Sequence, residues 1–172
     1  MARRTSLREF QESLARRLAE AGSAQPRALL GLQSGNDHWL IALPEAGEIM
    51  PVPDLTTVPL AKPWMRGLAN VRGTLYSAVD FSAFHGGEQI LPAGEARLIL
   101  VGARLGSNCA LLVSRTTGLR GVEDFELEPE AATEPGQPWR GPRMRDTTGR
   151  LWTRLLIPAL LADRSFLEAS AA

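Results

Sequence analysis

Short apolar segments, separated by glycines and prolines, recur along most of the chain. Candidate strands cover residues 29–32, 39–43, 48–50, 74–80, 98–101, 109–113 and 150–155, and polar turns such as 34–37 and 105–108 join them. A further segment, 119–127, is predicted to pair beside 98–101 and 109–113, which are apolar throughout and therefore expected to be buried on both faces. Many short strands with this punctuation are typical of an all-β barrel or sandwich and disfavour an α/β enzyme fold.

The two ends of the chain carry helical signals instead. Ser6 and Glu9 fit a capping box, and one predicted helical face then carries Leu7, Phe10, Leu14 and Leu18. Because the opposite face has both charge signs, this helix is predicted to pack either on the protein's own body or on a partner. A second, short helix is predicted from Pro158 through Asp163. We expect residues 1–26 to form the helix and its linker, and residues 27–170 to form one β domain.

The central stretch of the chain, residues 64–86, has the most distinctive sequence. Glycines stand at Gly67 and Gly73, and the strand predicted at 74–80 follows. The polar Asn70 and Arg72 interrupt an otherwise apolar run, so they either form buried hydrogen bonds or face a partner. This stretch is interpreted as the centre of a binding scaffold.

Composition excludes several classes of protein. The 172 residues suffice for one domain or two small lobes, and 19 basic side chains balance 19 acidic ones. Nucleic-acid binders usually have a basic excess, so this class is disfavoured. No apolar run approaches the ~20 residues that span a bilayer. We therefore expect a cytoplasmic protein without membrane insertion. The acidic stretch 123–134 is interpreted as a solvated loop, or less simply as an electrostatic patch.

Candidate catalytic residues are few and isolated. His38 and His85 are the two histidines, and both are interpreted as surface or cap residues. Asp80 is interpreted as the cap of the turn that follows it, and Cys109 as a buried small hydrophobe. No spacing fits a catalytic triad, a metal site or a phosphate loop. The sequence therefore predicts no enzyme, no cofactor and no metal.

An ordered set of residues resembles a known family, the CheW-like domain. The set comprises Pro59, Trp64, Gly67, Asn70-Val71-Arg72-Gly73, Asp80 and Gly86. Flanking features, including Glu48-Ile49 and Gly149-Arg150-Leu151-Trp152, extend the resemblance over residues 28–168. The sequence of residues 64–73 and the predicted N-terminal helix look most like the PilI branch of this family. That branch serves type IV pili and twitching motility.

The resemblance implies two intertwined SH3-like five-stranded β-barrels that form a non-catalytic chemosensory adaptor. Such an adaptor binds the regulatory domain of a CheA-type histidine kinase and, in a groove between its lobes, the cytoplasmic tip of a chemoreceptor. It thus joins a membrane receptor array through its partners. Glu48, Asn70, Arg72 and Gly73 are the implied protein-binding residues, while the strands of the first lobe would offer the kinase surface.

The role of Arg72 and the function class of the chain both remain open. Arg72 either faces the receptor or ties the two barrels together through backbone carbonyls. The chain as a whole could also be a small β-barrel module that binds another protein or a nucleic acid, although neutral charge and a single tyrosine disfavour base stacking. A hydrolase or transferase with a dispersed site that includes Asp80 is a third class.

Overall fold

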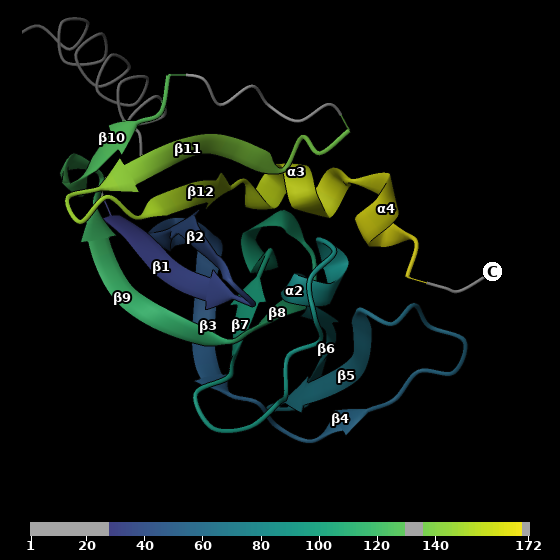
Figure 1. Ribbon diagram of the computed structural model, residues 1–172. Coiled ribbons are helices and arrows are strands. Elements are labelled where there is room, and N and C mark those ends of the chain that lie inside the picture. The colour runs from purple at the N-terminus through teal and green to yellow at the C-terminus, as the bar shows by residue number, and fades with distance from the viewer. Residues whose placement is uncertain (1–27, 130–135, 170–172) are drawn as a thin grey trace, which may run out of the picture.

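The computed structural model of the chain describes residues 28–129 and 136–169 (Figure 1). Within this part the backbone forms two β-sheets and a few short helices, so the all-β prediction is confirmed. The helix predicted around Leu7 to Leu18 lies outside the described residues.

The first sheet combines strands from both ends of the described chain. Its order is β10-β11-β12-β2-β1-β9, and only the β12–β2 pair is parallel. The strands are β1 (Ala28–Ser34), β2 (Asp37–Ala42), β9 (Arg115–Gly121), β10 (Phe125–Leu127), β11 (Arg140–Asp146) and β12 (Leu151–Leu155). A 3-10 turn, η3 (Val122–Asp124), connects the two edge strands β9 and β10 directly, which brings the edges together. We call this sheet the first barrel.

The second sheet is built from the continuous middle of the chain. Its order is β3-β7-β8-β6-β5-β4, with a parallel β6–β8 pair. The strands are β3 (Ala46–Pro51), β4 (Leu55–Thr56), β5 (Met65–Val71), β6 (Thr74–Asp80), β7 (Arg97–Val101) and β8 (Cys109–Val113). We call it the second barrel, and Figure 1 shows it below the first. Each barrel has one short strand, β10 or β4, beyond the five predicted.

Side chains alternate between the inside of each barrel and a core that both barrels share. On β8, Ala110 and Leu112 belong to the interior cluster of the second barrel. Cys109, Leu111 and Val113, on the opposite face, join the shared core. This two-residue period follows from strand geometry, and because both faces are covered, β8 is buried throughout as predicted.

Short helices seal the junction between the barrels. They are η1 (Leu43–Glu45), α2 (Phe81–Phe84), η2 (Ala103–Leu105), α3 (Ile157–Ala162) and α4 (Arg164–Leu167). Pro158 lies in the first turn of α3, as the sequence predicted. Phe166 of α4 stacks on Trp64 of the second barrel with the ring centroids 6.1 Å apart. The C-terminal helices therefore attach the end of the first barrel's chain to the second barrel.

Two sequence-based interpretations are wrong. The segment 119–127 does not pair beside β7 and β8: β9 pairs with β1, and β10 pairs with β11. The described part of the acidic stretch is not simply a loop, because it contains η3 and β10. Phe125 anchors this segment to the barrel, because its ring packs edge-on against Trp152 with the ring centroids 5.9 Å apart.

Candidate protein-binding site

The hairpin between β5 and β6 holds three of the predicted site residues in a fixed turn. Val71 pairs with Thr74, which leaves Arg72 and Gly73 as a two-residue loop. Both have positive φ angles, +52° and +85°, as in the type I′ turn that suits the twist of a hairpin. The Oδ1 atom of Asn70 accepts a hydrogen bond of 2.9 Å from the backbone N–H of Gly73. Asn70 therefore fixes the conformation of the turn that presents Arg72.

Glu48 and Arg72 form an ion pair across the second barrel. Glu48 lies on edge strand β3 and Arg72 at the far end of β5, yet the guanidinium donates to both carboxylate oxygens. The sheet must curl until its two sides meet, so this pair closes the barrel. The Arg72 side chain is 75% exposed. Its hydrogen bonds join two strands of one barrel; they do not tie the two barrels together.

Asp80, in contrast, has a buried structural role. It is fully buried and accepts hydrogen bonds from the backbone N–H groups of Ala83 (3.1 Å) and Ile90 (2.7 Å). Arg66 donates to the same oxygen, Oδ2, that accepts from Ile90, at 3.0 Å, and also donates to the carbonyl of Ile90. Its interpretation as a cap is therefore confirmed, because it starts α2 and anchors the loop that leads to β7.

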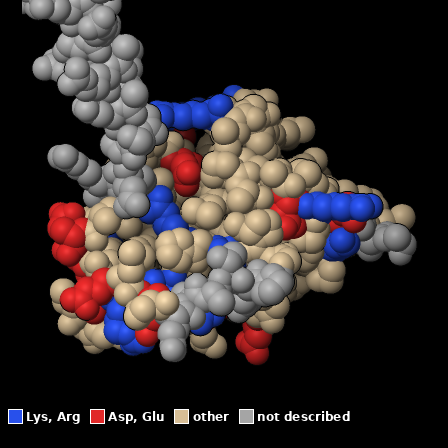
Figure 2. Space-filling model, turned by 90° about the horizontal axis from the view of Figure 1, so that it is seen from above, with Lys and Arg blue, Asp and Glu red and all other residues tan. Residues whose placement is uncertain are grey.

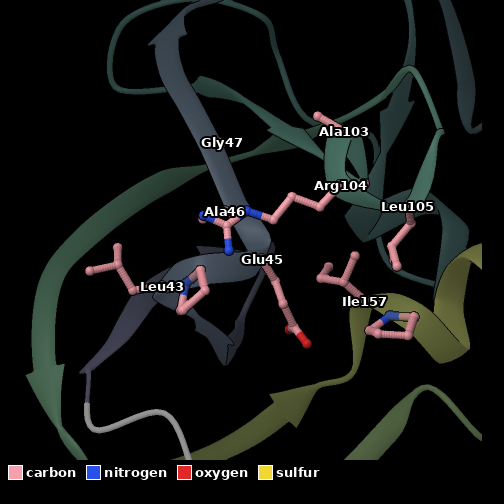
Figure 3. Close-up of a pocket in the computed structure, with 11 residues that line it drawn as sticks. Leu43, Glu45, Ala46, Gly47, Ala103, Arg104, Leu105 and Ile157 are labelled. Carbon is pink, nitrogen blue, oxygen red and sulfur yellow. The ribbon is translucent and has the colours of Figure 1, made fainter. Parts of the chain in front are cut away.

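A cavity of about 460 Å³ lies where the chain passes between the barrels (Figure 3). Its walls come from η1, the start of β3, η2 and the start of α3, and the residues that carry the argument below are Leu43, Glu45, Gly47, Arg104, Leu105 and Pro158. Figure 3 shows Arg104 extending from η2 toward Ala46. Since α3 follows the last strand of the first barrel and η2 belongs to the second, this cavity is the groove between the lobes.

Glu45 and Arg104 are the two charged residues in the otherwise apolar wall of this groove. Burial raises the pKa of the Glu45 carboxyl, while the charge of Arg154 and hydrogen bonds from backbone groups oppose that rise. The Oε2 atom is buried and accepts no hydrogen bond from any described residue.

Of the predicted site residues, Glu48 and its partner Arg72 lie nearest the groove. Gly47 lines it and Glu48 follows directly on β3, so the ion pair with Arg72 stands at its border. Asn70 and Gly73 lie farther along the hairpin and are not among the lining residues. Sequence reasoning missed the groove's own residues, such as Leu43 and Leu105. The turn at 105–108 was a local signal, but no local signal shows that it meets η1 and α3.

The histidines were interpreted as surface or cap residues, and His85 is indeed the C-cap residue of α2, but neither side chain is fully exposed. The His85 side chain is 4% exposed and packs against Trp39 and Phe81, with ring centroids 5.2 and 5.0 Å away. Its Nδ1 atom lies 3.6 Å from the carboxylate of Asp37. The glycines at 86 and 87 suggested a surface loop, but α2 turns His85 inward. His38 is partly buried against Trp152 at 5.0 Å.

Other chemical candidates remain inert in the structure. Burial raises the pKa of the Cys109 thiol to about 12, which confirms its interpretation as a buried hydrophobe.

On the face shown in Figure 2, basic and acidic side chains lie interspersed. Among the described residues no helix is long and apolar enough to cross a membrane.

Comparison with known proteins identifies similar sequences. The family model of the CheW-like domain matches residues 28–165. The chain is 33% identical over 142 residues to Protein PilI of Pseudomonas aeruginosa (strain PAO1), an alignment that covers 72% of this chain and 79% of that protein.

A solved structure has the same fold. The crystal structure of the scaffolding protein TtCheW from Thermoanaerobacter tengcongensis superposes with a TM-score of 0.62. The match covers 76% of this chain and 89% of the other, at 15% sequence identity. The architecture of two barrels is therefore shared at an identity too low to carry details of the surface.

Proposed function

The chain belongs to the CheW-like domain family, and we propose that it is a non-catalytic adaptor that couples a chemoreceptor to a CheA-type histidine kinase. The family match over residues 28–165 is the observation that carries the proposal. Among the described residues no group of histidine, cysteine and carboxylate side chains could hold a metal ion. The conspicuous features of this surface are a groove and a fixed, exposed ion pair, which suit binding.

The groove between the barrels is assigned to the receptor tip. A helical partner can lay apolar side chains against Leu43, Leu105 and Pro158, in the helix-in-groove mode of recognition. Leu105 is 54% exposed, so apolar surface is available there.

Arg72 is assigned to the partner surface beside this groove. A residue other than glycine at a φ of +52° costs roughly 1–2 kcal/mol, which the fold tolerates here in the middle of a tight turn. Glu48 and the turn hold the guanidinium in place, so its remaining donors are preorganised for polar groups of a partner. Strain of this kind at an exposed arginine is more easily explained by binding than by stability.

Calorimetric titration tests the proposal. The purified chain is titrated with the C-terminal regulatory region of a CheA-type kinase from the same organism. Saturable binding near equal stoichiometry is expected. A folded chain that shows no binding to this region overturns the kinase half of the proposal.

Arg72→Ala is expected to weaken binding to the receptor tip or the kinase by about ten-fold, because it removes a fixed charged contact. Since the side chain is 75% exposed, the thermal transition should stay cooperative. Arg164→Ala is the matched control: Arg164 is also an exposed arginine paired with a glutamate, but it lies on α4. Loss of the cooperative transition in Arg72→Ala would show that Arg72 is structural.

The output is assigned to type IV pili because the chain is 33% identical to Protein PilI. Deletion of the gene should abolish twitching on a surface and leave flagellar swimming intact. Loss of swimming with normal twitching contradicts this assignment and leaves the adaptor function standing.

A further inference from the structure

A second cavity, of about 440 Å³, opens on the first barrel at the end where β1 begins. Apart from Arg154 its walls are apolar, with Leu29, Val122, Phe125, Leu127, Met144 and Leu156 among them. Four of these, Leu29, Val122, Phe125 and Met144, also pack in the interior cluster of the first barrel. At the rim, Leu127 is 68% exposed. The cavity is therefore an opening into the apolar interior of the barrel.

The chain enters the first barrel beside this cavity. Ala28, the first described residue, pairs with Gly121. The residues that follow each of them, Leu29 and Val122, both line the cavity. Residues 1–27 thus join the barrel at the rim of its apolar opening.

The sequence of that preceding segment matches such an opening. Leu7, Phe10, Leu14 and Leu18 recur at spacings of three and four, a pattern that predicts one apolar helical face. Residues 19 to 28 connect Leu18 to Leu29, and ten residues can span up to roughly 35 Å. The connection is therefore long enough for the apolar face to reach the cavity.

We infer that this cavity is the docking site of the chain's own segment 7–18. A short tether gives the segment an effective concentration in the millimolar range, so even a weak apolar contact is populated within one molecule. A second copy would have to cover roughly 1,000 Å². Such a surface would extend beyond the lining residues, and Glu128 and Arg145, which follow Leu127 and Met144 in the chain, are already paired with one another.

Cysteine pairing in the full-length chain tests the inference. Leu14→Cys is combined with Leu127→Cys, and disulfide formation is followed under mild oxidation. The matched control combines Arg16→Cys, on the opposite face of the predicted helix, with Leu127→Cys. Native Cys109 does not compete, because it is buried and its pKa is raised to about 12.

The expected result is a disulfide within one chain that forms at least about ten-fold faster from position 14 than from position 16. Equal rates from both positions, or no bridge, overturn the inference. A bridge between two chains also overturns it and identifies a second copy as the occupant.

A second measurement does not depend on introduced thiols. Phe10→Glu should shift the amide resonances of residues 122–127 and of Met144, because a charged side chain cannot remain in the apolar cavity. Amides near Leu91, which is exposed on the second barrel, should not move. Unchanged resonances at 122–127 contradict the inference. Neither experiment involves the kinase or the receptor, so the proposed function can fail independently.

Discussion

Gly67 and Gly73 belong to the same hairpin and both have positive φ angles, but their surroundings differ. A Cβ atom on Gly67 would lie 2.3 Å from the backbone carbonyl oxygen of Thr56 on the neighbouring strand β4. At Gly73 nothing lies within 4 Å of that position. Gly67 is therefore required both for its backbone angle and for the approach of β4, whereas Gly73 is required for its angle alone.

Gly67→Ala should lower the free energy of unfolding by about 3 kcal/mol, because β4 must move away from β5. Gly73→Ala should cost only about 1–2 kcal/mol, the price of a left-handed backbone for alanine. Urea denaturation of the two variants measures both values. Equal losses of unfolding free energy in the two variants would show that the close contact with Thr56 adds nothing to the cost at Gly67.

His85 is a second residue whose environment has a measurable consequence. Burial lowers the pKa of its imidazole from the ordinary value of 6.5, Arg140 lowers it further, and the carboxylates of Asp37 and Asp80 oppose this. In the unfolded chain the imidazole has its ordinary pKa. The unfolded state therefore binds more protons between the folded pKa and about 6.5, which favours unfolding as the pH falls through that range.

The contribution of His85 should accordingly lower the stability as the pH falls below about 6.5. His85→Gln should reduce this dependence. His38→Gln should reduce it less, because His38 has a lowered pKa but is less buried. Thermal unfolding at several pH values measures how steeply the stability depends on pH. An unchanged dependence in His85→Gln contradicts its assignment to His85.

At the scale of elements, α2 shows how one carboxylate starts a helix of only four residues. A helix this short is marginal by itself, so it depends on its cap. Asp80 supplies that cap from one oxygen and holds Arg66 and Ile90 with the other. The α4 helix has a simpler cap, Asp163, which accepts from the backbone of Ser165 and Phe166.

Asp80→Asn should destabilise the protein by about 3 kcal/mol, since it leaves the largely buried charge of Arg66 without its counterion. Asp163→Asn is the matched control and should cost well under 1 kcal/mol, because asparagine also caps helices. Chemical denaturation at neutral pH measures both. Similar losses in the two variants would show that the ion pair adds no stability beyond the cap.

Elements set by local sequence could be predicted, and their long-range pairing could not. The pattern around Cys109 to Val113 identified β8 and its burial, and Asp80 identified the cap of α2. The pairing of β9 with β1 was missed, because 80 or more positions separate residues such as Leu30 and Leu119. Glu48 and Arg72 were named together only through the family resemblance, since no periodic pattern connects β3 with the later hairpin.

At the scale of the whole molecule, the shared core makes the two barrels interdependent. Leu30 and Trp39 of the first barrel pack in one cluster with Ile99 and Leu111 of the second. Neither barrel can lose this cluster without exposing buried apolar surface of the other. This core was foreseen only from the family's architecture, because the alternating strands could equally build a sandwich.

The molecule should therefore unfold in a single transition, with calorimetric and van't Hoff enthalpies that agree. Trp39→Ala, in the shared core, should lower the melting temperature of both barrels together and cost about 3–5 kcal/mol. Near-ultraviolet circular dichroism and scanning calorimetry follow the transition. Two separate heat-absorption peaks would show that the barrels are independent.

The insertion of the second barrel between β2 and β9 also sets the order of events during biosynthesis. A ribosome extends a chain by roughly 5–20 residues per second, so several seconds pass between the synthesis of β8 and that of β12. The second barrel can close within that time, while the hairpin of β1 and β2 still lacks its neighbour β12. The newly closed barrel then serves as a template: it covers the apolar side chains of the early hairpin and holds it in place until the last strands emerge.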